Sequence, residues 1–473
     1  MHERQQRRRL GAWYTPEVLV GHVVAAALEG TEAVPRRVLD PACGDGRFLE
    51  AVRTALAARG HSVQVCGVDV DPQAIEAARA LLGPTAELIG ADALQHDWGR
   101  RRFDLIIGNP PFLSPLTAGN TAHLVTRGAR YADTAVAFWH LAHRLAEPRG
   151  GRVAFVLPVS VLASRDAGPV RAEVAQRAAL RWWWWADTPV FPDAQVITGA
   201  VVTECGGAPE PVRRRVGVHF DEAPSVVPPT PTTDTWGWLV ADALGLPVAG
   251  LDTLNTAGTV AQRVAVRGDF RDQYYGLVGA VDDADEECDG IPLVTSGLID
   301  PGTCRWGERP VRFAGRRFAR PTVHVERLSP GLQAWARRRL VPKVLVASQT
   351  RVIEAVADPN GAWLPGVPVI SALPGDGVDV WDVAAVLSSP VASLWLAHRS
   401  AGTGRSARVV RVSAPVLAEV PWPRGDLSIA AAAMRNGDLD AAAHATLTAY
   451  GVNETLASGW STWWRSAIPR RAR

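Results

Sequence analysis

The chain has 473 residues, of which 50 are basic and 48 acidic, so its formal net charge is only +2. Hydrophobic residues make up 47% and charged residues 21%, a balance typical of a globular protein with a buried core and not of a disordered or fibrous one. The small net charge excludes a uniformly basic nucleic-acid coat, although local basic patches remain compatible with it.

The five cysteines are scattered and form no CxxC pair, so the sequence predicts neither a metal site nor a disulfide framework. The basic N-terminal stretch is not followed by the apolar run of a signal peptide. No stretch of about 18 apolar residues occurs. We therefore expect a cytoplasmic, nucleoid-associated protein without a membrane span.

The first two hundred residues alternate apolar strands with amphipathic helices. In chain order, the predicted elements are a strand ending at Asp40, helix 48–58, strand 63–69, helix 72–82, strand 86–90, strand 103–108, helix 135–145 and strand 152–158. Such an alternation predicts a parallel sheet covered by helices on both faces. Sheets of this kind bind ligands beyond the carboxyl ends of their strands, so the segments at those ends carry the functional information.

Three polar segments follow predicted strand ends. The first, DPACGDG at 40–46, has small residues that let the backbone approach a ligand closely, although it could equally be an ordinary turn. Asp69 ends the next strand, where a carboxylate can accept both hydroxyls of a ribose. Asp71 before Pro72 is instead placed to cap the following helix. Asp92 is a further acid just after a strand.

The segment Gly108-Asn109-Pro110-Pro111-Phe112 is the most informative one. The two prolines stiffen the loop that leaves the strand, which presents the Asn109 amide oxygen beside the Pro110 carbonyl. Two acceptors suit the two N–H bonds of an exocyclic amino group, and Phe112 can stack on a planar base. A lone NPPF would more simply be a rigid turn with a core phenylalanine, but three cofactor-type segments precede this one.

In this order, the motifs DPACGDG, GVDVDP, GADA and FDLIIGNPPF resemble those of S-adenosylmethionine-dependent amino-methyltransferases. WYTPE at 13–17 is similar to the segment that precedes the glycine motif in gamma-type N6-adenine DNA methyltransferases, and the segments 150–158 and 190–203 continue the same order. The resemblance spans about residues 10–205 and is closest to the TaqI-type and Eco57I-type enzymes of restriction–modification systems.

This resemblance implies roles for residues around the cofactor. Thr15 would contact the methionine carboxylate of S-adenosylmethionine. Asp40 and the backbone at Ala42 and Gly44 would surround its methionine part.

The remaining implied contacts involve the nucleoside of the cofactor and the target base. Asp69 would bind the ribose hydroxyls, and Asp92 the adenine amino group of the cofactor. Asn109 and the Pro110 carbonyl would bind the target amino group, with Phe112 stacked on the target base. Phe191 would be a second stacking partner, although it could equally be a core aromatic.

Position 112 departs from the family pattern. Many relatives carry tyrosine where Phe112 stands, so stacking is retained but a phenol hydroxyl is lost.

The chemistry follows from these contacts. Accepting both N–H bonds pulls the amino nitrogen toward tetrahedral geometry, so its lone pair can attack the sulfonium methyl group directly and in line. No covalent enzyme intermediate is needed, and Cys43 is therefore expected to be a small spacer and not a nucleophile. In duplex DNA the target base must flip out of the stack to be reached.

The C-terminal half carries the predicted partner surface. Residues 206–235 are rich in Gly and Pro and predict an exposed connection, with VRRRVGVHF (212–220) as one last edge strand. Residues 301–351 hold twelve basic residues and two acids, and a second basic stretch without acids lies at 399–411. The arginines that we expect to contact DNA are Arg316, Arg317, Arg320, Arg405 and Arg408.

We therefore expect an α/β fold, with a Rossmann-like S-adenosylmethionine-dependent methyltransferase domain at 1–222 followed by a mixed α+β target-recognition domain at 236–473. The expected activity is site-specific transfer of a methyl group to the N6 amino group of adenine in double-stranded DNA. The expected partners are double-stranded DNA and, as a candidate, a separately encoded restriction endonuclease; we expect a monomer. Three alternatives remain open: an N4-cytosine DNA methyltransferase, a protein-glutamine N5-methyltransferase and a catalytically silent DNA-specificity protein.

Overall fold

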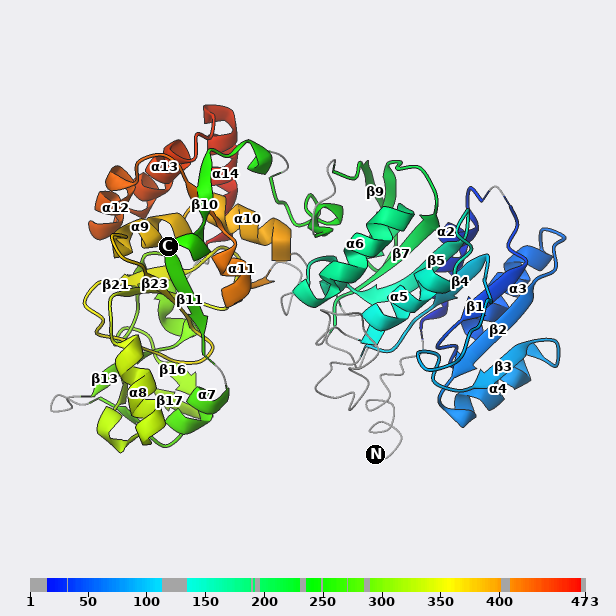
Figure 1. Ribbon diagram of the computed structural model, residues 1–473, viewed down its shortest axis with the longest axis horizontal. Helices are drawn as coiled ribbons and strands as arrows, with labels where there is room; N and C mark the ends of the chain where they lie inside the picture. The colour runs from blue at the N-terminus through cyan, green and yellow to red at the C-terminus, as the bar shows by residue number, and fades with distance from the viewer. Residues whose placement is uncertain are drawn as a thin grey trace. The chain divides into compact units, whose positions relative to one another are not determined.

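The computed structural model describes residues 15–31, 33–112, 134–188, 190–191, 196–229, 235–247, 250–269, 271–284, 290–400 and 409–468. This described chain divides into two compact units, one up to Leu239 and one from Val240 onward (Figure 1). The expected domains at 1–222 and 236–473, with their functional assignment, stay predictions.

The first unit is built on one large sheet, in which nine strands of the described chain follow the order β3-β2-β1-β4-β5-β7-β6-β8-β9. The strands are β1 (Arg37–Asp40), β2 (Gln64–Asp69), β3 (Glu87–Gly90), β4 (Leu105–Gly108), β5 (Arg152–Pro158), β6 (Ala178–Trp185), β7 (Thr198–Cys205), β8 (Val212–Val216) and β9 (Asp221–Val226). Strands β1 to β5 are parallel, and β7 runs antiparallel between β5 and β6. The α/β class with a parallel sheet is thus confirmed.

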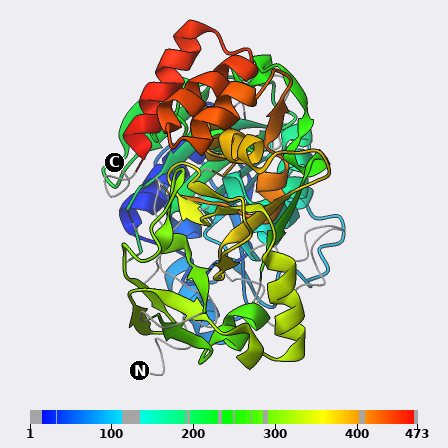
Figure 2. The same ribbon diagram turned by 90° about the vertical axis from the view of Figure 1, so that its left-hand side faces the viewer.

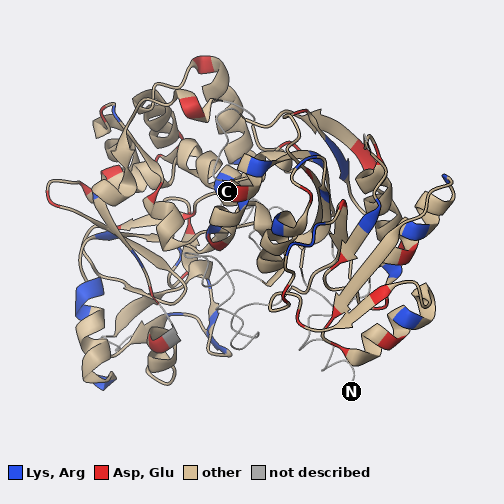
Figure 3. Cartoon of the chain, turned by 45° about the vertical axis from the view of Figure 1, so that its right-hand side comes forward, with Lys and Arg blue, Asp and Glu red and all other residues tan. Residues whose placement is uncertain are grey.

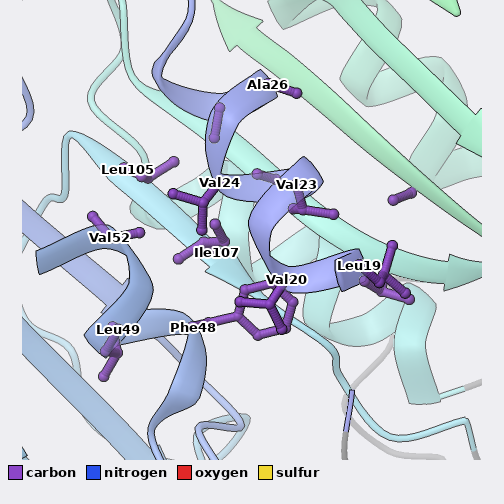
Figure 4. Close-up of a cluster of buried hydrophobic side chains, with 14 of the residues drawn as sticks. Leu19, Val20, Val23, Val24, Ala26, Phe48, Leu49, Val52, Leu105 and Ile107 are labelled. Atoms are coloured by element: carbon purple, nitrogen blue, oxygen red, sulfur yellow. The ribbon is translucent and has the colours of Figure 1, made fainter. Parts of the chain in front are cut away.

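Helices cover both faces of this sheet. Three of them, α2 (Glu17–Leu28), α3 (Arg47–Ala57) and α4 (Pro72–Leu82), pack on one face. Figure 4 shows how side chains of α2 and α3 meet Leu105 and Ile107 of β4 in this core. The helices α5 (Thr134–Leu145) and α6 (Gly168–Arg177) contact β5 and β6 respectively. Alternate strand residues therefore point into separate apolar layers, as the near-continuous hydrophobic strands predicted.

The observed elements lie within two residues of the predicted ones. The strand expected at 103–108 begins at Leu105, because Phe103 forms only an isolated bridge with Ala146. Helix α4 begins at Pro72, and Asp71 caps it through a hydrogen bond of 3.0 Å from the backbone N–H of Gln73, as expected.

Residues 206–235 differ from their expected role as a connection. They include both β8 and β9, and β9 pairs with β8, so the outer strand of the sheet is β9 and not the segment 212–220. The sheet of the first unit thus continues to Val226. Its pairing could not be predicted, because β9 is short and polar.

The four consecutive tryptophans at 182–185 lie in β6 and are each at most 5% exposed. Trp182 and Trp184 join the core that contains α2 and α3. Trp183 packs against the Cα of Gly199, where a Cβ atom would lie 2.6 Å from the indole ring. The run is therefore structural, with no face left to line an open site.

The second unit has a mixed α+β architecture, and two of its hydrophobic clusters, called here the larger and the smaller core, contain most of its clustered buried side chains. The larger core surrounds an antiparallel sheet with the order β11 (Val264–Gly268), β23 (Ile370–Pro374), β19 (Lys343–Val346) and β21 (Ala355–Asp358). The helices of this core are α9 (Val380–Leu387), α10 (Pro390–Ser400), α11 (Ala414–Ala418), α12 (Ser428–Arg435) and α13 (Leu439–Ala449). Helix α14 (Glu454–Ala467) packs on α10 and α13. Helices α12, α13 and α14 lie side by side (Figure 2).

The smaller core of this unit lies between short strands and two helices. Its members are β12 (Val281–Asp283), β13 (Ile291–Val294), β16 (Val311–Phe313), β17 (Arg316–Phe318), β18 (Pro321–Val323), β22 (Leu364–Pro365), α7 (Arg271–Leu277) and α8 (Pro330–Arg339). The remaining short strands are β10 (Thr256–Thr259), β14 (Ile299–Asp300), β15 (Thr303–Cys304), β20 (Gln349–Thr350), β24 (Val410–Arg411) and β25 (Pro421–Pro423).

Within the described residues, no single helix has the length and apolarity to cross a membrane. Helices α9 and α10 have this length and apolarity only when taken together, and the pair is bent by 54°.

Candidate functional site

The predicted site residues of the first unit gather at the carboxyl edge of the parallel strands. Asp40 ends β1 and is paired in register with Gly67, while Asp69 ends β2 opposite Gly90 of β3. Asn109 follows directly after β4, which pairs with β1 on its other side. In the order β3-β2-β1-β4, the chain adds β2 and β3 on one side of β1 and then β4 on its other side. Ligands of such folds usually bind at the carboxyl edge where the strand order reverses in this way.

The loop after β1 is tied to the neighbouring strand by two hydrogen bonds. The N–H of Cys43 donates to the Val68 carbonyl, and the N–H of Gly44 donates to Oδ2 of Asp69, both at 2.9 Å. Gly44 has φ +53°, and a Cβ atom there would meet no heavy atom within 4 Å. The loop therefore needs glycine for its backbone angle and leaves open space above it.

Asp40 is a buried carboxylate, only 1% exposed. Its Oδ1 accepts the N–H of Ala42 at 3.0 Å, and a Cβ atom at Gly108 would lie 2.4 Å from that oxygen. Burial raises the pKa of Asp40 well above its usual range, and the nearby Asp69 and Asp45 add to this.

Asp69 accepts backbone hydrogen bonds at both oxygens, from Gly44 and from Asp71 at 2.9 Å each. Burial raises the pKa of this carboxyl as well. Each oxygen keeps a second lone pair, which a ribose hydroxyl can use. Asp92 similarly accepts the Leu94 N–H and the Gln95 side-chain amide, at 2.9 and 2.7 Å.

The carboxylates of this edge, which accept hydrogen bonds, fit a positively charged nucleoside cofactor. In the described part of the chain, neither Asp40 nor Asp69 forms an ion pair. A bound ammonium group would offset the cost of ionising two buried carboxylates. The open space over Gly44 and the lone pairs of Asp69 supply room and hydrogen-bond acceptors for a ribose.

A hydrogen bond links Asn109 to Thr15, 94 residues earlier in the chain. The Asn109 Nδ2 donates to the Thr15 hydroxyl at 3.1 Å, and Thr15 is only 4% exposed. The Thr15 carbonyl accepts from Nη1 of Arg47 at 2.8 Å, and Arg47 in turn pairs with Asp45 of the glycine loop. This chain of contacts fixes the orientation of the Asn109 amide and joins it to the DPACGDG loop.

The aromatic candidates differ in their exposure. Pro110 is buried, and the ring of Phe112 is half-buried against the core beneath the loop. Phe191 is 2% exposed and belongs to the same core. Phe112 is thus placed to offer part of its ring to a ligand, whereas Phe191 would have to leave its packed position, and its stacking role stays a prediction.

Cys43 lies in the loop as a buried spacer. Its Sγ would meet a Cβ atom at Gly67 at 2.9 Å, so the two small residues let β2 and the loop approach closely. Burial raises the pKa of the Cys43 thiol, and the carboxylates of Asp40 and Asp69 raise it further. A thiol held neutral in this way is a poor nucleophile.

Many arginines of the basic stretch 301–351 are neutralised by partners within the second unit. Arg305 and Arg309 both pair with Asp300, which is 1% exposed, and Arg339 pairs with Asp269. The chain's sole lysine, Lys343, is fully buried against Asp358 at 2.5 Å. Figure 3 shows that basic and acidic residues are intermixed along the ribbon.

Three predicted DNA contacts of this stretch lie at the surface. Arg316, Arg317 and Arg320 are exposed, with Arg316 over the Phe318 ring at 5.3 Å and Arg320 over that of Trp306 at 5.1 Å. Arg405 and Arg408 lie outside the described residues.

Two residues at the carboxyl edge of the first unit and one residue of the second unit were not singled out from the sequence. Arg47 directly follows the second glycine of the DPACGDG loop, which is a usable signal for a residue near the cofactor position. Gly108 closes β4 against Asp40, and only the packing shows that it must be glycine. Arg312, exposed on β16, was not separated from its neutralised neighbours.

Comparison with known proteins gives one family match. Residues 1–180 match the model described as N-6 DNA Methylase. The type II methyltransferase M.TthHB8I of Thermus thermophilus is 33% identical over 203 residues, which cover 40% of this chain and 44% of that relative. The type II methyltransferase M.CvrRI of Paramecium bursaria Chlorella virus XZ-6E is 31% identical over 166 residues, covering 35% of this chain and 41% of the relative. The chain thus spans less than half the length of these relatives.

A similar fold occurs over almost the whole chain in one solved structure. The type IIL restriction–modification enzyme MmeI, determined in complex with DNA, aligns with a TM-score of 0.63 and 13% sequence identity. The alignment covers 98% of this chain and 79% of that one. At this identity the similarity shows a shared fold for both units.

Proposed function

We propose that this chain methylates the N6 amino group of adenine in double-stranded DNA, with S-adenosylmethionine as methyl donor, because residues 1–180 match the model described as N-6 DNA Methylase. The observation that carries this proposal is the Asn109 amide, which Thr15 orients at the same carboxyl edge of the sheet as Asp40 and Asp69. The two relatives are named as type II methyltransferases, and MmeI was determined with DNA, which supports DNA as the substrate.

The cofactor position would lie over the glycine loop. Asp40 would face the methionine part together with the backbone at Ala42 and Gly44, Asp69 would accept from the ribose hydroxyls, and Asp92 would accept from the adenine amino group. Thr15 would hold the methionine carboxylate. When bound, S-adenosylmethionine supplies a methyl group on a positively charged sulfur, which an amine nitrogen can attack directly.

Asn109 and Pro110 would activate the target amine. Because the Asn109 Nδ2 donates to Thr15, the amide oxygen is the atom assigned to accept an N–H bond of the target. The Pro110 carbonyl accepts the second one. Both bonds hold the amine nitrogen with its lone pair directed at the methyl group. After transfer the methylated nitrogen carries one proton too many, and this proton is released to water.

Phe112 would hold the base after it leaves the duplex. Its half-buried ring offers a face for stacking, worth about 1–3 kcal/mol per base, which offsets part of the stacking lost on flipping. Phe191 could add a second face only after moving from the core. The exposed arginines of the second unit, Arg316, Arg317 and Arg320, would contact DNA, as would Arg405 and Arg408.

N4-cytosine methylation is the nearest alternative, since its target is also an exocyclic amine. A glutamine N5-methyltransferase fits less well, because enzymes of that kind are shorter and need no second unit of this size. A silent specificity protein would not need the oriented Asn109. A separately encoded endonuclease and a monomeric state are further parts of the proposal.

The decisive experiment is modification-sensitive sequencing of DNA from a methylation-free host that expresses this chain. We expect N6-methyladenine in one sequence context, and none with Asn109→Ala, which should still bind the cofactor. Cys43→Ala is the matched control from the same edge of the sheet and should remain active, because the reaction needs no thiol. N4-methylcytosine would move the assignment to the alternative, and absence of any modified base would refute the proposal.

A further inference from the structure

Strands β16 and β17 form a short two-stranded hairpin with chemically distinct faces. The cross-strand pairs are Val311 with Phe318, Arg312 with Arg317, and Phe313 with Arg316. Val311, Phe313 and Phe318 are buried, and the two phenylalanines belong to the smaller core of the second unit. The hairpin is therefore anchored by its apolar face, which leaves the other face and the turn exposed.

Arg312 and Arg317 lie directly opposite each other on this exposed face. Directly opposed residues of an antiparallel pair have Cβ atoms about 4.5–5.5 Å apart, and like charges in that position destabilise a sheet. No ion pair to either side chain occurs among the described residues. The two paired strands thus hold two adjacent positive charges, and no ion pair among the described residues compensates them.

Two acids near Arg317 have other partners. Asp283 and Glu308 line a surface hollow together with Arg309 and Arg317. The Asp283 carboxylate accepts the backbone N–H groups of Ala319 and Arg320, and Glu308 pairs with Arg305 at 3.0 Å. Among the described residues, neither acid forms an ion pair with Arg312 or Arg317.

The turn of the hairpin adds a second unfavourable feature. Ala314 and Gly315 connect the strands, with φ values of +48° and +81°. Both central residues of such a two-residue turn need positive φ, for which Asn-Gly is preferred over an alanine. The alanine side chain is smaller than that of asparagine, so the turn is narrower, although its backbone is strained.

We infer that this hairpin enters the major groove of DNA and that Arg312 and Arg317 read guanine edges there. The inference rests on the proposed function. Paired strands lie about 4.8 Å apart, and the major groove, about 12 Å wide, admits a two-stranded ribbon. Arginine is the side chain that donates two hydrogen bonds to O6 and N7 of guanine. Arg316 and Arg320, which stack on aromatic rings, would instead flank the hairpin and contact phosphates.

The test compares two double variants of equal charge. Arg312→Gln/Arg317→Gln removes the opposed pair, whereas Arg337→Gln/Arg338→Gln removes two exposed arginines from α8 of the same unit. Both variants are expressed in the methylation-free host, and methyl transfer is measured on duplex DNA that carries the sequence context found for the unmodified chain. We expect at least a tenfold loss of rate at subsaturating DNA for the hairpin variant, and less than a threefold loss for the helix control.

A second arm identifies the atom that is read. The same duplex is prepared with 7-deazaguanine, which lacks the N7 acceptor in the major groove. The unmodified chain should lose at least fivefold in rate on this DNA, while the hairpin variant should lose nothing further, because its reading side chains are already absent. Equal losses for both proteins, no loss for the unmodified chain, or equal rates of the two double variants would each overturn the inference.

The two proposals fail in different ways. If the unmodified chain methylates no DNA, the proposed function falls and the hairpin inference with it. If it methylates DNA and the hairpin variant matches it in rate and sequence context, only the hairpin inference falls. A thermal unfolding midpoint of the hairpin variant at or above that of the unmodified chain is expected, because the opposed charges are gone, and it excludes misfolding as the cause of lost activity.

Discussion

Thr15→Val should slow methyl transfer by disturbing the Asn109 amide. The substitution keeps the shape of the side chain but removes the hydroxyl that accepts from Asn109 Nδ2 at 3.1 Å. Because Thr15 is 4% exposed, water cannot readily replace the lost acceptor. Losing this hydrogen bond at a buried position costs about 1–3 kcal/mol. The amide can then rotate, and the rate of transfer should fall by about 5- to 150-fold at saturating cofactor.

The assay is single-turnover transfer of a radiolabelled methyl group to duplex DNA, with cofactor affinity measured separately by calorimetry. Thr15→Ser restores the hydroxyl and should recover most of the rate. The contact of Arg47 with the Thr15 carbonyl is present in both variants, so they differ only in the side chain. If Thr15→Val weakens cofactor binding but transfers at the normal rate once cofactor is saturating, Thr15 holds only the cofactor and the positioning argument is wrong.

Three further substitutions test the packing and charge of the two units. Gly108→Ala would place a methyl group 2.4 Å from Oδ1 of the buried Asp40, so the melting temperature should fall with a loss of about 1–3 kcal/mol, and cofactor binding should weaken. Asp40→Asn should change how stability depends on pH: burial raises the pKa of Asp40 in the folded state, so the folded chain binds its proton more tightly than the unfolded one, and stability falls as pH rises above about 4. In urea unfolding without cofactor, the free energy of unfolding of Asp40→Asn relative to that of the unmodified chain should therefore increase from pH 4 to pH 8. Lys343→Met should leave the Asp358 charge buried and unpaired, with a loss of about 3–5 kcal/mol in urea unfolding.

Each of these substitutions has an internal control. Gly21→Ala, where a Cβ atom in α2 meets nothing within 4 Å, should stabilise the chain by about 0.5–1 kcal/mol and so shows that glycine replacement alone is not harmful. A parallel pH profile for Asp40→Asn and the unmodified chain would contradict a raised pKa. Lys343→Met/Asp358→Asn should recover part of the lost stability, and equal stability of the single and double variants would mean that the pair is not coupled.

The elements of the first unit could be read from sequence because their signals are local. A strand such as β5 is a continuous apolar run, and α4 begins with an aspartate cap and a proline, so neighbouring residues decide each element. The segment 206–235 was harder, because β9 carries few apolar residues and forms only by pairing with β8. Its polar composition resembles that of a loop until a partner strand is present.

The ordered motifs at the strand ends could be read from the order of the residues alone, since topology brings the carboxyl ends of parallel strands to one edge and places Asp40, Asp69 and Asn109 there. The contact by which the Thr15 hydroxyl orients Asn109 exists only in the folded chain, because it joins segments 94 residues apart. Folding also determines which arginines are available: the buried Asp300 neutralises Arg305 and Arg309, whereas Arg312 and Arg317 on the exposed face of the hairpin form no ion pair among the described residues. The number of charged side chains can be counted in a sequence, but the accessibility of each one depends on which side chains the fold packs beside it.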